Sequence, residues 1–107
     1  MKEDLYWQDT MYGGDFETVV TAPAWMRNDT DHEYGADIWL KAYDTSRCES
    51  PSEKELARIG YKFMCEVRLR HADDGLGYTC LAKRAVRTRE DAERFFKDYI
   101  EQLEETK

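Results

Sequence analysis

Residues 63–83 read FMCEVRLRHADDGLGYTCLAK, and this stretch decides the fold. Apolar and polar residues mostly alternate in 63–70, and a similar run returns in 78–83, which predicts two β-strands. Between the two runs lies Asp74-Gly75, a dipeptide that favours a tight turn with positive backbone φ angles. The stretch therefore predicts an antiparallel hairpin.

A two-residue turn also predicts which side chains share a face of this hairpin. The expected cross-strand pairs are Val67 with Ala82 and Leu69 with Cys80 on one face, and Glu66 with Lys83 and Arg68 with Leu81 on the other. The first face is apolar and is expected to form the core, whereas the second is mostly charged. Cys65 and Cys80 then both point into the core but are offset, so no disulfide between them is expected.

A C-terminal helix is predicted over residues 89–105, with Thr88 as its N-cap. Apolar residues recur there at the spacing of one helical face: Ala92, Phe95, Phe96, Tyr99, Ile100 and Leu103. Such a stripe must pack on an apolar surface, and one face of the sheet provides it. Phe95, Tyr99 and Ile100 are expected to be mostly buried.

Two further strands are predicted over residues 16–22 and 34–43. A capping-box pattern at Ser52–Glu55 predicts a short helix before the hairpin. Residues 1–12 fit either a helical turn or a first strand that closes through Gly13-Gly14. The expected fold is a single α+β domain over residues 1–107, with a mainly antiparallel sheet of about four strands, the C-terminal helix on one face and a short helix inserted before the last hairpin.

The 107 residues carry a net charge of −7 that is unevenly distributed. Residues 1–53 hold four basic and twelve acidic side chains, whereas residues 54–94 hold ten and seven. Three cysteines, no N-terminal leader pattern and no long apolar run favour a cytoplasmic protein that does not enter a membrane. The acidic excess favours basic partners over phosphate backbones.

No catalytic or metal motif accompanies the two histidines, His32 and His71. Residues 28–33, NDTDHE, are dense in oxygen ligands but lack the central glycine and distant glutamate of a calcium-binding loop. We therefore expect no enzyme activity, no metal and no cofactor.

The favoured hypothesis is a non-catalytic binding protein whose acidic half contacts a basic partner. Its candidate binding residues are Asp29, Asp31, Glu33, Asp37, Trp39 and Tyr43. Small acidic domains act as inhibitors of nucleic-acid-processing proteins, as immunity proteins and as phage-encoded, anti-CRISPR-like blockers of host defence. The analogy rests on size and charge alone.

The alternative hypothesis is a single-stranded nucleic-acid-binding module, because aromatic and basic side chains share the charged face of the sheet. Its candidate residues are Trp39, Tyr43, Lys62, Arg68, Arg70 and Lys83. The net charge of −7 weighs against it. A further possibility is that the N-terminal segment, with Tyr6 and Trp7, folds over this face and buries Trp39.

Overall fold

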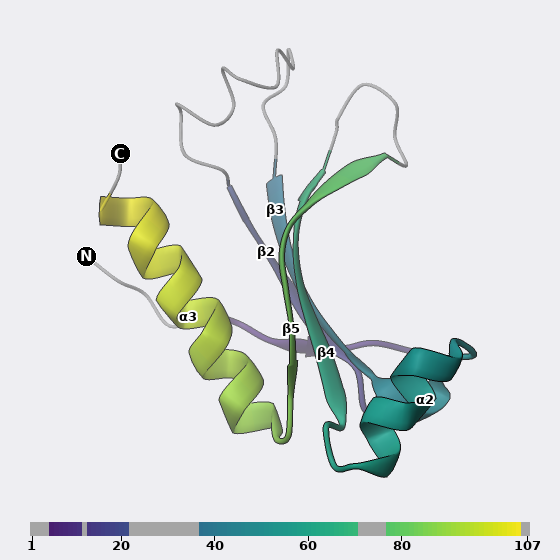
Figure 1. Ribbon diagram of the computed structural model, residues 1–107. Coiled ribbons are helices and arrows are strands. Elements are labelled where there is room, and N and C mark those ends of the chain that lie inside the picture. Colours follow the sequence, from purple (N-terminus) through teal and green to yellow (C-terminus); the bar gives the residue numbers. More distant parts are fainter. Residues whose placement is uncertain (1–4, 12, 22–36, 71–76, 106–107) are drawn as a thin grey trace.

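The protein is seen in a computed structural model that describes residues 5–11, 13–21, 37–70 and 77–105 (Figure 1). Its strands form one sheet in the order of the chain, with every neighbouring pair antiparallel. The elements are β1 (Gln8–Asp9), β2 (Phe16–Thr21), β3 (Asp37–Asp44), the 3-10 helix η1 (Thr45–Arg47), α2 (Pro51–Arg58), β4 (Phe63–Arg70), β5 (Tyr78–Val86) and α3 (Arg89–Glu105). The predicted α+β class and both helices are confirmed.

The sheet has five strands where about four were expected, because residues 8 and 9 form a short first strand. The chain turns back through Gly13 and Gly14, whose φ angles of 62° and 70° lie in the left-handed region that favours glycine. The amide of Thr10 donates to the carbonyl oxygen of Asp15 at 3.0 Å across this turn. Of the two possibilities for the N-terminal segment, the strand is therefore the one that forms.

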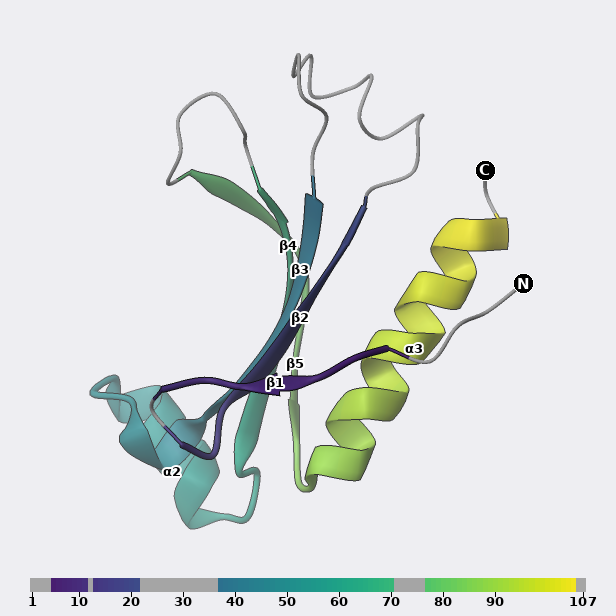
Figure 2. The ribbon, with the colours of Figure 1, turned by 180° about the vertical axis from the view of Figure 1, so that it is seen from behind.

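Helix α3 packs across one face of the sheet, and Figures 1 and 2 show it alongside the strands from both sides. Thr88 caps it as predicted, since its hydroxyl accepts a hydrogen bond of 3.1 Å from the amide of Asp91. The residues of α3 that are buried are Ala92, Phe96 and Leu103. Phe95, Tyr99 and Ile100 are partly buried and pack against this core as expected, but none of them is buried as deeply as Phe96.

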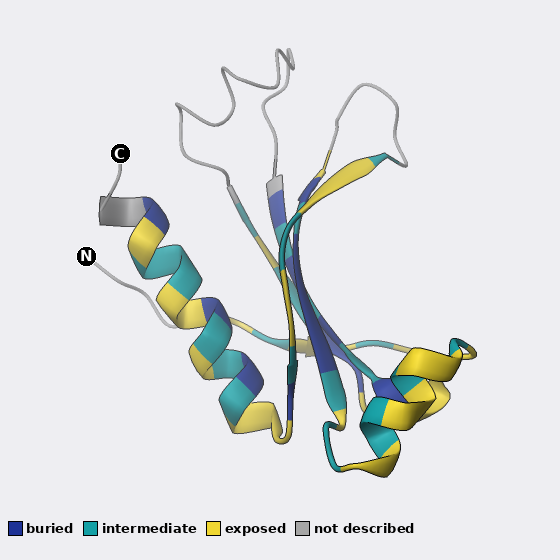
Figure 3. Ribbon diagram, viewed as in Figure 1, coloured by how far each residue is buried: buried dark blue, intermediate teal, exposed yellow. Residues whose placement is uncertain are grey.

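The core between α3 and the sheet is built around two phenylalanines, Phe16 of β2 and Phe96 of α3, both fully buried. Trp7 packs against both, with ring centroids 5.1 Å from Phe16 and 5.2 Å from Phe96. The buried strand residues around them form the dark interior of Figure 3: Ile38, Leu40, Ala42, Cys65, Val67 and Leu69.

The position of Trp7 shows on which side of the sheet the N-terminal segment lies. Its ring lies on the helix-covered side, and Tyr6 beside it is 75% exposed. Residues 5–11 therefore do not fold over Trp39, and the possibility that this segment buries it is wrong for the described part of the chain.

Helix α2 begins two residues earlier than the capping-box pattern suggested. Its N-cap is Ser50, with Pro51 in the first turn, where a missing amide hydrogen costs nothing. The helix ends before Gly60, whose φ of 104° suits glycine. No residue of α2 is buried, so this helix lies at the surface (Figure 3).

The last hairpin keeps only half of its predicted register. Val67 faces Ala82 and Glu66 faces Lys83 as expected, but the pairing shifts between Val67 and Arg68. Beyond this β-bulge, Arg68 faces Cys80 and Leu69 faces Thr79. The predicted pairs Arg68 with Leu81 and Leu69 with Cys80 are therefore wrong, because the bulge moves the start of β5 by one residue and reverses its faces.

Candidate binding face of the sheet

The face of the sheet opposite α3 is called here the outer face, and the strand register places its side chains in rows across the strands. One row contains Glu17, Lys41, Glu66 and Lys83; the next contains Val19, Trp39, Arg68 and Cys80; and Arg70 pairs with Tyr78 beyond them. The first row alternates in charge sign from strand to strand. Opposite charges on neighbouring strands stabilise the pairing.

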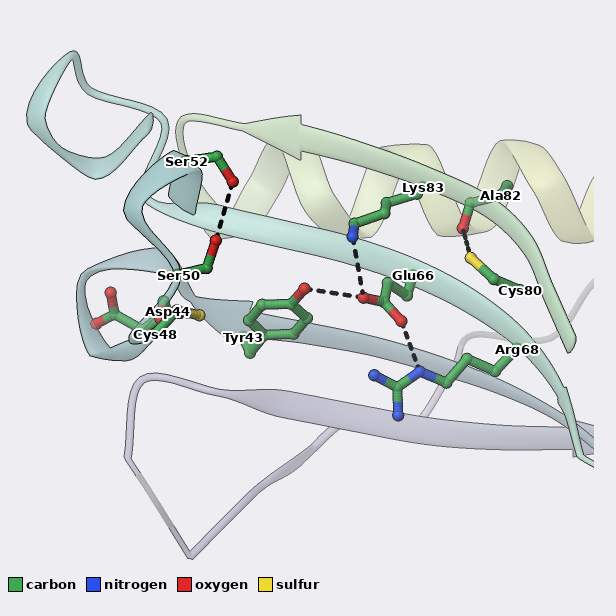
Figure 4. Close-up of polar contacts among 10 residues, drawn as sticks. All are labelled: Tyr43, Asp44, Cys48, Ser50, Ser52, Glu66, Arg68, Cys80, Ala82 and Lys83. Carbon is green, nitrogen blue, oxygen red and sulfur yellow. Dashed lines mark hydrogen bonds and ion pairs between the residues drawn. The ribbon is translucent and has the colours of Figure 1, made fainter. Parts of the chain in front are cut away.

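The carboxylate of Glu66 is the centre of a polar network on this face (Figure 4). Arg68 donates to it through Nε at 2.7 Å, and Lys83 lies 3.8 Å away. Tyr43 donates its hydroxyl hydrogen to Oε2 of the same carboxylate at 2.8 Å. These partners cover Glu66 so well that only 6% of the residue is exposed, although it lies on the face away from the core.

The network shifts the titration of two of its members. Burial alone would raise the pKa of Glu66, but the hydrogen bonds from Arg68 and Tyr43 and the nearby cationic charges outweigh it, so this pKa lies below its ordinary value. Burial raises the pKa of the Tyr43 hydroxyl, and the carboxylates of Glu53 and Glu66 raise it further. Glu66 is therefore an ionised carboxylate and Tyr43 a neutral donor at neutral pH.

The other end of the outer face carries a second, different cluster, which we call the aromatic patch. It consists of Val19, Trp39, Arg68, Arg70 and Tyr78. The guanidinium carbon of Arg70 lies 5.0 Å from the ring centroid of Trp39, and that of Arg68 lies 4.4 Å from the ring centroid of Tyr78. Cation–π contacts of this kind hold both rings in place.

The aromatic patch is open to solvent. Tyr78 is 47% exposed and Val19 is 44% exposed, while Trp39 is half-buried. Tyrosine, tryptophan and arginine are the residue types that dominate the energy of protein interfaces. Residue types of this kind are thus gathered at this end of the sheet, with Tyr78 and Val19 exposed.

The predicted partner-binding residues fall in three places. Asp29, Asp31 and Glu33 lie outside the described residues, and Asp37 begins β3 opposite Thr21, at the same end of the sheet as the aromatic patch. Trp39 belongs to that patch. Tyr43 lies at the opposite end of β3, where its hydroxyl is engaged by Glu66.

The predicted nucleic-acid residues are also divided. Arg68 and Arg70 lie on the rings of the aromatic patch, whereas Lys83 lies in the Glu66 network. Lys62 lies outside the strands, and its carbonyl oxygen accepts a hydrogen bond of 2.9 Å from the amide of Thr45 near α2. The structure thus brings together Trp39, Arg68 and Arg70 and leaves Lys62 away from them.

The sequence interpretation missed Tyr78, because the simple hairpin register places it on the core side. The bulge between Val67 and Arg68 turns both Tyr78 and Cys80 to the outer face. The run Cys80-Leu81-Ala82 breaks the alternation of the strand, and this break is the signal that would have revealed the bulge.

All three cysteines are free, as predicted, but their environments differ from the expectation. Cys65 is buried, and burial raises its pKa to about 12. Cys80 is exposed, so the expectation that it points into the core was wrong. Cys48 is half-buried and donates to the carbonyl oxygen of Asp44 at 3.6 Å.

The expectations about metal-binding residues and histidines concern residues both inside and outside the described part of the chain. Within residues 5–11, 13–21, 37–70 and 77–105, no three His, Cys, Asp or Glu side chains lie together as a metal site. His32 and His71 lie outside these ranges. Among the helices described, none is long and apolar enough to cross a membrane.

Comparison of the chain with known protein families, with curated proteins and with solved structures finds no match. The function therefore has to be argued from the outer face itself.

Proposed function

We propose that this protein is a non-catalytic binding domain that recognises a basic protein partner through the aromatic patch and the acidic segment that joins β2 to β3. The observation that carries the proposal is the pairing of Trp39 with Arg70 and of Tyr78 with Arg68 at an end of the sheet where Tyr78 and Val19 are exposed. Rings fixed in this way lose little conformational freedom on binding, which favours affinity.

The charges of the outer face favour a protein over a phosphate backbone. Glu66 forms ion pairs with Arg68 and Lys83, and Glu17 lies 3.9 Å from Lys41. These three cations are therefore largely neutralised within the molecule. A nucleic acid is bound mainly by cationic side chains that neutralise its phosphates. Cations that are already paired with carboxylates neutralise phosphates poorly.

An acidic segment of the chain connects two strands at this end of the sheet. Segment 22–36 joins Thr21 to Asp37, which pair at the same end of the sheet as Tyr78 and Arg70. Asp29, Asp31 and Glu33 belong to that segment. Carboxylates beside an aromatic patch would steer a basic surface toward it and fix its orientation.

A binding role of this kind fits an inhibitor or blocker of a nucleic-acid-processing protein, because such proteins expose the basic surfaces on which carboxylates replace phosphates. The test is affinity capture from the cells that make the protein, with mass spectrometry of what is retained. The wild type is compared with Trp39→Ala and Tyr78→Ala, and Tyr6→Ala is the control because Tyr6 is exposed outside the aromatic patch. A basic protein retained by the wild type and the control but lost by both patch variants supports the proposal.

Replacement of Asp29, Asp31 and Glu33 by lysine tests the electrostatic part separately. We expect slower association with the captured partner and a weaker salt dependence. An unchanged association rate would show that these three carboxylates do not contribute to binding, and only the aromatic patch would remain as the proposed binding surface.

Single-strand binding is the competing function, since Trp39 and Tyr78 present ring faces on which bases stack. Fluorescence titration with mixed-sequence oligonucleotides at low salt distinguishes the two. Micromolar binding that falls steeply with salt would overturn the protein-binding proposal in favour of this one.

A further inference from the structure

A pocket of about 350 Å³ lies away from the aromatic patch, where the end of β5 and the start of α3 meet the connection between α2 and β4. Its charged lining consists of Arg84, Arg87, Arg94, Asp91 and Asp98, and its rings are Tyr61 and Phe95. The volume is at the lower end of the range typical of small-molecule sites, about 300 to 1,000 Å³. The pocket is large enough for more than a single inorganic ion.

The charges of this pocket do not cancel in the way those of the outer face do. Arg94 is held by Asp91 at 3.2 Å. Within the residues that the structure describes, neither Arg84 nor Arg87 forms an ion pair with a carboxylate. With Asp98 also in the lining, the five charged side chains leave a net charge of +1 to attract an anionic ligand, in a region of the sequence that is itself mildly basic.

Arg87 is held in place by its surroundings. Its guanidinium carbon lies 4.4 Å from the ring centroid of Tyr61. A Cβ added at Gly60 would lie only 2.7 Å from Nη1 of Arg87, so the glycine leaves the room that this side chain occupies. A preorganised guanidinium binds an oxyanion at a smaller entropy cost than a free one.

We propose that this pocket binds a small phosphomonoester that carries a planar ring, the chemistry of a nucleoside monophosphate. A phosphomonoester carries a charge of about −1.5 to −2 at pH 7, opposite in sign to the guanidinium groups of Arg84 and Arg87 that would bind it. Phe95 and Tyr61 provide the apolar walls for the ring. Because Asp98 lowers the net positive charge of the lining, the monophosphate is expected to be preferred over the more highly charged triphosphate.

Titration calorimetry with AMP, adenosine, ATP and inorganic phosphate tests the proposal on the full chain. We expect saturable AMP binding with a Kd below about 1 mM, which corresponds to modest affinity. Adenosine, ATP and phosphate are each expected to bind more weakly.

Arg84→Gln and Arg87→Gln should each weaken AMP binding by about tenfold or more, since each removes a charge-assisted hydrogen bond. Arg58→Gln is the matched control, because this exposed arginine lies on α2 outside the pocket and pairs with Glu55.

Each contrary outcome overturns a stated part of the proposal. If adenosine binds as tightly as AMP, the pocket does not recognise the phosphate. If inorganic phosphate binds as tightly as AMP, the pocket does not recognise the ring. ATP binding more tightly than AMP would contradict the role of Asp98. No saturable AMP binding up to about 10 mM, or equal binding by the double variant Arg84→Gln/Arg87→Gln, would reject the site.

A second measurement does not depend on the variants being folded. In NMR spectra of the wild type, AMP should shift the amide resonances of residues 84–87 and 94–98. Shifts confined to other residues would place AMP elsewhere and overturn the proposal.

Discussion

Tyr43 of β3 donates a hydrogen bond of 2.8 Å to Oε2 of Glu66 of β4, the carboxylate that Arg68 and Lys83 also hold. This bond makes Tyr43 part of the framework of the outer face. Trp39, four residues earlier on the same strand, belongs to the aromatic patch, where it pairs with Arg68 across the strands and Arg70 lies over its ring. The outer face thus carries the Glu66 network toward one end and the aromatic patch toward the other, and Arg68 contacts both Glu66 and Tyr78.

Glu66→Gln should destabilise the fold by about 1 to 3 kcal/mol at neutral pH, because the charge-assisted bonds to Arg68 and Tyr43 become neutral ones. Denaturant unfolding measures the change. Glu17→Gln is the control: the ion pair of Glu17 with Lys41 is 3.9 Å long and partly exposed, so a loss below about 1 kcal/mol is expected. Equal losses in the two variants would contradict the central position of Glu66.

The contribution of Glu66 should also depend on pH, because its pKa is lower in the folded protein than in the unfolded chain. The stabilisation is present above the unfolded value of about 4.3 and is lost as the pH falls through the lower folded value. The difference in unfolding free energy between wild type and Glu66→Gln should therefore be constant near neutrality and shrink below about pH 4. A difference that persists unchanged at acid pH would show that the carboxylate charge is not its source.

Phe96→Ala should destabilise the fold by about 3 to 5 kcal/mol, since its ring is fully buried among Trp7, Phe16 and Phe95. Phe95→Ala removes the same group from the half-buried margin of the helix and should cost only about 1 to 2 kcal/mol. Thermal and denaturant unfolding of the pair give the comparison. A larger loss for Phe95→Ala would mean that α3 packs through a different face.

Brief alkylation of the native protein should label Cys80 first, because it is the exposed thiol, and Cys65 last. Burial protects Cys65 and raises its pKa to about 12, which leaves almost no thiolate at neutral pH. Burial also raises the pKa of Cys48, so this thiol should react between the two. Mass spectrometry of the labelled peptides gives the order, and labelling of Cys65 before Cys80 would contradict the bulged register of β5.

Local patterns in the sequence were sufficient for most of the fold. The cap at Thr88 and the apolar stripe of residues 89–105 depend only on residues within a few turns of one helix. The face of the hairpin on which Val67 lies follows from the alternation of apolar and polar residues. The bulge opposite Val67 and Arg68 depends on how β5 packs on β4 and α3, so it could not be predicted from a turn dipeptide. The same applies to Phe96, whose depth is set by the position of Trp7 and Phe16.

The candidate site was predictable only in part. Trp39, Arg68 and Arg70 were identified because alternation placed them on one face. Tyr78 was missed because the bulge reverses its face, and Tyr43 was placed in the binding set because nothing local shows that Glu66 binds its hydroxyl. Pairing between neighbouring strands of the sheet determines both outcomes.

The most direct test of the proposed function is the affinity of the captured partner for Trp39→Ala, measured by calorimetry beside the wild type and Tyr6→Ala. We predict that Trp39→Ala raises the Kd by about thirtyfold or more, the effect of losing a hot spot of about 2 kcal/mol, while Tyr6→Ala leaves it unchanged. Circular dichroism confirms that the variants remain folded. An unchanged Kd for folded Trp39→Ala, or a capture that recovers no basic protein, would contradict the proposal.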